Sequence, residues 1–219
     1  MKSNREKRGQ FVIIAVMLIA IMIVSIGALM HGAITYYKHE PWQEYSTLVG
    51  DIEINSRRIV ELSLATYTNP PKDGSILKYN LEKWQDDLQV IYPSSGISLN
   101  AFDYALGLSP DSSKPAANAV FALNISSIGL KGYTFSVEAF LELKIGSAST
   151  PYNLTATVTS ETGEPVKGLG RDNFRINGTA PTAVTPVYEG NTLVYKIVCH
   201  ANSLSLVEVW DQRGIRAQV

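Results

Sequence analysis

Few residues of this chain have the type and spacing that catalysis requires. Cys199 is followed directly by His200, but neighbouring residues on a strand point to opposite faces, so they cannot act as a catalytic pair. The adjacent acids Asp86 and Asp87 lie in a segment with helical spacing, where sequence neighbours also diverge. We therefore predict that the chain is not an enzyme and has no catalytic residues.

The sequence also contains no pattern that predicts a metal or cofactor site. His31, His39 and His200 are far apart and are joined by no second cysteine or acidic cluster, as a metal site would require. Glycine-rich phosphate loops and nucleophile-elbow motifs are absent from the sequence. We expect no metal and no cofactor. Cys199 has no intramolecular disulfide partner, and burial in a strand is the leading interpretation over metal ligation, intermolecular pairing or a reactive thiol.

Three acceptor sequences for N-linked sugars occur after the first hundred residues. They are Asn124-Ile125-Ser126, Asn153-Leu154-Thr155 and Asn177-Gly178-Thr179. All lie on the side of the chain that the charge pattern described below places outside the cell. The hypothesis is therefore glycosylation at Asn124, Asn153 and Asn177.

Composition and charge limit the class of protein and of partner. The chain is 45% hydrophobic and 18% charged, which excludes a disordered chain. Its net charge is −1, yet the first nine residues carry four basic side chains and one acidic side chain. The remainder is mildly acidic, so no nucleic-acid partner is expected.

An apolar run follows the basic residues. Residues 11–30 contain no charged side chain, and Ser25 is their only polar one. A helix of about 20 such residues matches the ~30 Å hydrocarbon core of a bilayer. Because the basic residues flank only its N-terminal side, the short tail is expected in the cytoplasm and the large C-terminal part outside. The pattern predicts a single-pass transmembrane helix, suited to contact with lipid or with neighbouring copies.

The segments beyond the apolar run change from helical to strand-like patterns. Apolar residues spaced three and four apart predict helices over 42–66 and 76–89. Alternating residues predict a hairpin from 117–125 and 134–145. The small polar stretch 146–151 is the best candidate for a linker.

The last 70 residues contain regularly spaced short strands with glycine, proline and asparagine turns, typical of an antiparallel sandwich. The expected fold class is α+β and membrane-anchored, with one transmembrane helix, a helix-plus-hairpin region and a C-terminal antiparallel β-sandwich. The expected parts are a cytoplasmic leader (1–9), the transmembrane helix (10–37), an extracytoplasmic helical region with a hairpin (38–148) and the sandwich (149–219).

The junction Lys7-Arg8-Gly9-Gln10-Phe11 resembles the class III signal peptide of archaeal type IV pilin-like proteins. The resemblance implies that a prepilin peptidase cuts after Gly9, so that Gln10 becomes the N-terminus and the helix stays on the mature subunit. Ile14 occupies the fifth mature position, where bacterial-type pilins have glutamate and archaeal members vary. The alternative is an uncleaved signal anchor.

A second resemblance concerns the C-terminal part. Residues 162–169, followed by Asn173-Phe174, resemble the first inter-strand turn of prokaryotic immunoglobulin-like surface modules, and residues 211–215 resemble their final hairpin. The resemblance implies an immunoglobulin-like sandwich in the C-terminal part.

Together these features predict a membrane-anchored extracellular protein of structural or adhesive function, resembling a type IV pilin subunit. The implied partners are the membrane, a prepilin peptidase, and copies of itself or other pilin-like subunits through the N-terminal helix. The implied location is the cell membrane or a surface filament. The alternative is an uncleaved single-pass receptor or binding protein that presents an immunoglobulin-like domain to a ligand or membrane partner. A third reading is an accessory subunit of a membrane enzyme.

Overall fold

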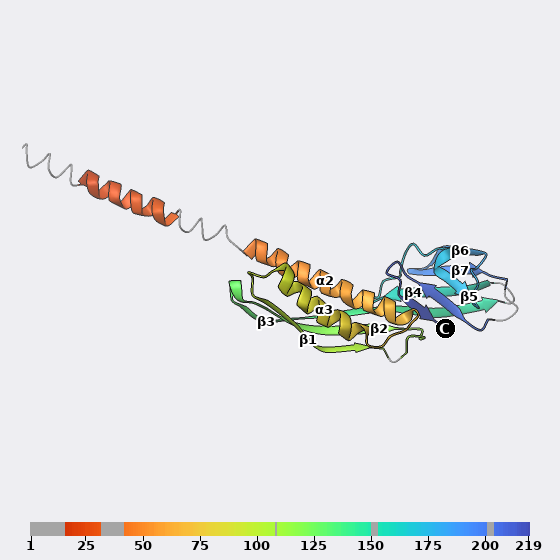
Figure 1. Cartoon of the computed structure of the whole chain (residues 1–219). Coiled ribbons are helices and arrows are strands. Elements are labelled where there is room, and N and C mark those ends of the chain that lie inside the picture. The colour runs from red at the N-terminus through yellow and green to blue at the C-terminus, as the bar shows by residue number, and fades with distance from the viewer. Residues whose placement is uncertain (1–15, 32–41, 108, 150–152, 201–203) are drawn as a thin grey trace, which may run out of the picture. The chain divides into compact units, whose positions relative to one another are not determined.

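The computed structural model describes residues 16–31, 42–107, 109–149, 153–200 and 204–219. The chain divides into two compact units, one ending at Gly50 and the other spanning Asp51–Val219 (Figure 1). Within the described residues there are three α-helices: residues 16–31, α2 (Trp42–Thr68) and α3 (Ile76–Ile91). The strands are β1 (Ile97–Leu106), β2 (Ala116–Ile125), β3 (Leu130–Ser149), β4 (Asn153–Ser160), β5 (Phe174–Ile176), β6 (Ala183–Glu189), β7 (Thr192–Val198), β8 (Val207–Trp210) and β9 (Arg216–Gln218).

The predicted transmembrane helix is not confirmed. Among the described residues no helix has both the length and the apolar character needed to cross a membrane. The expected membrane-anchored fold class and single-pass location in the cell membrane are therefore wrong.

Helix α2 turns one stripe of side chains inward because its buried residues recur every fourth position. Ile52, Ser56, Val60 and Leu64 are at most 1% exposed. The neighbouring helix α3 buries three leucines, Leu77, Leu81 and Leu88. Both helices lie on one face of the sheet made by β1, β2 and the first half of β3 (Figure 1).

Two buried serines of α2, Ser56 and Ser63, are matched by polar side chains of α3. Trp84 Nε1 donates a hydrogen bond to Ser56 Oγ at 3.0 Å. Asn80 Nδ2 donates to Ser63 Oγ at 3.0 Å. Buried hydroxyls need such partners, so these bonds fix which faces of the two helices meet.

The sheet under the helices follows the period-two rule. Five alternate residues of β2, from Ala117 to Ile125, are at most 1% exposed and face the helices. Phe121 of β2 stacks on Phe135 of β3 with ring centroids 5.0 Å apart. Phe121 is fully buried, whereas Phe135 is half-buried, so the pair extends from the core toward the surface.

Strand β3 is shared by two parts of the six-stranded sheet, whose order is β1-β2-β3-β4-β7-β6. Its first half pairs with β2 as far as Phe140, and its second half, from Leu141 to Ser149, pairs with β4. The stretch 146–149, predicted as a linker, is therefore paired strand. At Gly146 a Cβ atom would lie 2.6 Å from Thr155 Oγ1, so any other residue there would require the Thr155 side chain to move.

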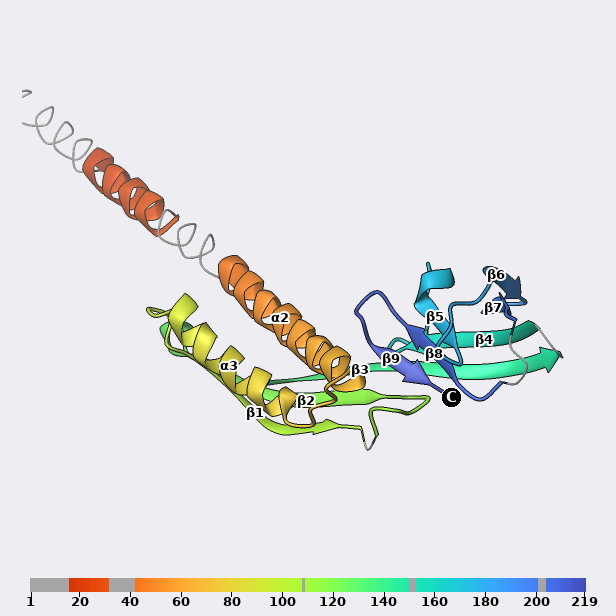
Figure 2. The ribbon, with the colours of Figure 1, turned by 45° about the vertical axis from the view of Figure 1, so that its right-hand side comes forward.

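A second sheet has the order β5-β8-β9 and packs on the C-terminal strands of the first (Figure 2). Phe174 of β5 meets Tyr195 of β7 with ring centroids 5.7 Å apart, and both side chains are fully buried. All strand pairs are antiparallel, so the described structure is mostly antiparallel sheet. Strands β4, β7 and β6 continue the sheet begun by β1–β3. The domain boundary at residue 149 stays a prediction.

Candidate functional site

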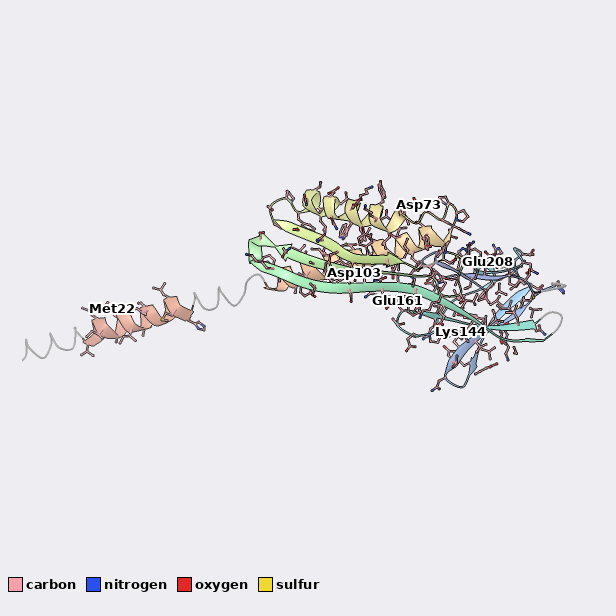
Figure 3. All side chains as sticks on the ribbon, turned by 90° about the horizontal axis from the view of Figure 1, so that it is seen from below. Met22, Asp73, Asp103, Lys144, Glu161 and Glu208 are labelled. Atoms are coloured by element: carbon pink, nitrogen blue, oxygen red, sulfur yellow. The ribbon has the colours of Figure 1, made fainter. Side chains whose placement is uncertain are left out.

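The helix of residues 16–31, called the apolar segment below, exposes all of its large aliphatic side chains. Their exposed fractions run from 53% at Ile26 to 74% at Leu29. Met22 is labelled in Figure 3, where the side chains of this helix stand out from the ribbon. The other exposed members are Val16, Met17, Leu18, Ile19, Ile21, Ile23, Val24 and Met30.

The exposed surface of the apolar segment extends around the whole helix. Every residue from 16 to 31 is exposed, so no single face is reserved for a core. Ala20, Gly27 and Ala28 are the small members, and a Cβ added at Gly27 would meet nothing within 4 Å. A helix that is apolar all round is stable only when other apolar surface surrounds it.

In the unit Asp51–Val219 one concentration of charge is the Arg213 cluster, formed by Arg213, Glu61, Glu161 and Asp211. The guanidinium lies 3.2 Å from Glu61, 2.9 Å from Glu161 and 2.7 Å from Asp211. Its Nη2 also donates to the carbonyl of Phe140 at 3.1 Å. Glu161 is labelled in Figure 3, close to strand β3. The cluster joins α2, the turn after β4 and the β8–β9 turn.

The surroundings of the cluster shift the pKa values of Glu161 and Arg213. Burial acts to raise the pKa of Glu161, but hydrogen bonds from backbone N–H groups and from Arg213, with the charge of Arg213, hold that pKa below its ordinary value. Burial acts to lower the pKa of Arg213, but Asp211 and Glu161 raise it further than burial lowers it. Both groups are therefore held in their charged forms.

The C-terminal end of α2 is attached to the β8–β9 hairpin by uncharged polar contacts. Trp210 Nε1 donates to Asn69 Oδ1, and Asn69 Nδ2 donates to the carbonyl of Gly214, both at 2.9 Å. The backbone N–H of Arg216 donates to Thr68 Oγ1 at 3.1 Å. We call these contacts, together with the Arg213 cluster, the α2 junction.

A second ionic group lies beside this junction. Arg216, which is 8% exposed, binds Glu208 at 3.3 Å and also binds Asp111. Asp111 in turn binds Lys72 at 2.6 Å. The loop between β1 and β2 is thereby tied to the C-terminal strand and to the turn after α2.

Neither charged group has the arrangement of a catalytic centre. Each carboxylate of the Arg213 cluster is already bound to the guanidinium, so none is poised as a general acid or base. A hollow of about 520 Å³ borders the cluster and is lined by Glu61, Glu164, Lys167 and Gln212 among others. No group of three or more potential metal ligands occurs in the described part of the chain.

The residues considered for chemistry lie apart in the structure. Cys199 is buried at 6% exposure. His200 next to it is exposed, as are Asp86 and Asp87 on α3. The structure brings none of these four together with the Arg213 cluster, whose residues no local sequence pattern had indicated.

The three predicted glycosylation residues have different surroundings. Asn124 is half-buried in β2, and its Oδ1 accepts the N–H of Gly132 at 2.8 Å. Asn153 is exposed as the first residue of β4, and Asn177 is exposed in a turn after β5. The processing residues Gly9 and Gln10 lie outside the described residues, so cleavage stays a prediction.

Comparisons with known proteins give no relative. No family model, no curated protein and no solved structure matches the chain.

Proposed function

We propose that this chain is a structural subunit of the type IV pilin-like kind, which assembles with copies of itself through the apolar segment of residues 16–31. The observation that carries the proposal is the exposure of every large aliphatic side chain in that segment, from 53% to 74%. Burying one such side chain contributes about 1.5–3 kcal/mol, so covering the segment is strongly favourable.

Copies of the same chain suit this segment better than a single groove in another protein. A groove covers one face of a helix, whereas here residues on all faces are exposed. A bundle of identical helices supplies apolar neighbours on every side. Ala20, Gly27 and Ala28 leave room for helices to approach closely.

The folded unit Asp51–Val219 would be the part that such an assembly displays. Its α2 junction holds α2 to the C-terminal strands through the Arg213 cluster and Asn69. A subunit held by its N-terminal helix needs this kind of attachment to keep its strands in place. The junction supports a structural role and identifies no ligand.

Charging the apolar segment should abolish self-association. Wild-type protein in detergent-free buffer should sediment as large species, because only other copies cover the segment. Ile19→Asp with Ile23→Asp should give the 24.0 kDa monomer, since two carboxylates cannot be buried in an apolar bundle without a large penalty. Sedimentation velocity measures both.

The matched control is Val90→Asp, which places a carboxylate on α3 at a residue that is 79% exposed. It should leave the sedimentation of the wild type unchanged. A wild-type protein that is monomeric at micromolar concentration would count against the proposal, as would a double variant that associates as before.

Leader processing provides an independent prediction. Intact-mass analysis of protein from the native host should show Gln10, or its cyclised form, at the N-terminus. Gly9→Val should abolish this species, because a side chain obstructs the close backbone approach that glycine allows. Ser3→Val in the same tail is the control and should be processed normally.

Retention of residues 1–9 in a host that processes other prepilins would remove the pilin-like part of the proposal. The uncleaved binding protein would then be the preferred function.

A further inference from the structure

The acceptor sequence Asn177-Gly178-Thr179 forms a two-residue turn at the end of β5. Asn177 and Gly178 have φ values of 52° and 79°. The N–H of Ile176 donates to the carbonyl of Thr179 at 2.8 Å, and the N–H of Thr179 donates back at 3.0 Å. Positive φ at both central residues defines the tight hairpin turn for which Asn-Gly is the preferred pair.

This acceptor sequence differs from the other two in burial. Asn177, Gly178 and Thr179 are all exposed. By contrast, the middle residues of the other two sequences, Ile125 and Leu154, are 0% and 3% exposed and belong to the core. A transferase that must grip three consecutive residues can reach the turn without unfolding a strand.

The side-chain oxygen of Asn177 accepts three hydrogen bonds. Oδ1 accepts hydrogen bonds from Ser205 N at 3.0 Å, Ser205 Oγ at 2.8 Å and Leu206 N at 3.0 Å. An N-linked sugar is attached to Nδ2, and the product keeps the Oδ1 carbonyl. These three hydrogen bonds are therefore compatible with the modified side chain.

We propose that Asn177 is the residue of this chain that accepts an N-linked glycan, and that Asn124 and Asn153 are not modified in the folded protein. The co-reactant is a glycosyl phosphate on a lipid carrier. Asn177 Nδ2 forms a bond to the anomeric carbon, and the bond from that carbon to the phosphate oxygen breaks. The phosphate leaves with the electron pair, and one amide proton passes to a base of the transferase.

The test uses the full chain expressed in a host that glycosylates a control protein with the same acceptor signal. Intact mass and glycopeptide mapping should find one glycan, at Asn177. Thr179→Ala should remove it while leaving the Asn177 side chain and its hydrogen bonds in place. Ser126→Ala and Thr155→Ala should both retain the full glycan mass, and Thr179→Ser should retain part of it.

Unmodified wild-type protein in that host would overturn the inference. So would a glycan whose mass is lost with Ser126→Ala or Thr155→Ala but not with Thr179→Ala. Self-association does not enter this measurement, so failure of the proposed assembly leaves the inference intact.

Discussion

A fragment that begins at Ser149 should fail to fold, whereas a fragment from Trp42 to Val219 should melt in one cooperative transition. The shorter fragment lacks residues Leu141 to Ala148 of β3, which pair with β4. Leu141 and Leu143 in that segment are at most 1% exposed, so their loss opens the core of the remaining strands.

The shorter fragment also lacks several partners of its C-terminal strands and of the turn between them. Trp210 loses Asn69, Arg213 loses Glu61, and the backbone N–H of Gln218 loses the carbonyl of Ser112. Circular dichroism and thermal melting distinguish the outcomes, because a cooperative transition reports a packed native state. A β-type spectrum with a cooperative melt from the shorter fragment would instead support an independent domain from residue 149.

Replacing Arg213 with glutamine should lower the free energy of unfolding by about 2–4 kcal/mol at neutral pH. The side chain of Arg213 is 22% exposed, and those of Glu61, Glu161 and Asp211 are 20%, 14% and 3% exposed. Without the guanidinium, three carboxylates remain close together with no opposite charge between them. Urea unfolding at pH 7 measures the loss.

The stability of the wild type and that of Arg213→Gln should respond differently to pH. The pKa of Glu161 in the folded protein is below its ordinary value of 4.5, so its contribution to stability is complete above pH 4.5 and is lost as the pH falls through the folded pKa. The wild type should therefore lose stability on acidification. Protonation relieves carboxylate repulsion in Arg213→Gln, so its deficit should shrink at about pH 3.5.

Lys144→Gln is the matched control because it also removes one cation beside a carboxylate. Lys144 lies 3.0 Å from Glu142, but its side chain is 67% exposed, so the change should cost less than about 1 kcal/mol. Equal effects of the two substitutions, or a deficit in Arg213→Gln that is independent of pH, would contradict the stabilising role of the cluster.

The regular spacing of apolar residues predicted most helices and strands correctly. The pattern over 42–66 corresponds to α2 at Trp42–Thr68, and the pattern over 76–89 corresponds to α3 at Ile76–Ile91. Strand β7, where Leu193, Val194 and Ile197 are buried, is one of the short strands expected in the last 70 residues. In these segments the spacing of the buried residues matches the period of the element that they form.

The spacing of apolar residues did not predict two features of the strands. Strand β1 contains a bulge between Ala101 and Asp103, which breaks the alternation on which strand prediction depends. The end of β3 consists of glycine, serine and alanine, yet Ala148 pairs with Leu154 of β4. Backbone pairing requires no particular side chain, so a strand can resemble a linker in composition.

The Arg213 cluster could not be predicted from short stretches of sequence, for a different reason. Arg213 meets Glu61 across 152 positions of sequence and Glu161 across 52. Charged residues at such separations carry no periodic pattern, and only the fold brings them together. Gly9 and the three acceptor sequences, by contrast, were found from short motifs.

The continuity of β3 determines where this chain can be extended or tagged. By composition, residues 146–149 look like a tolerant place for an insertion. One added residue there would displace Ala148 and Ser149 from their pairing with Leu154 and Asn153 of β4. A tag placed between Gly190 and Asn191, in the exposed turn that joins β6 to β7, would leave that register intact.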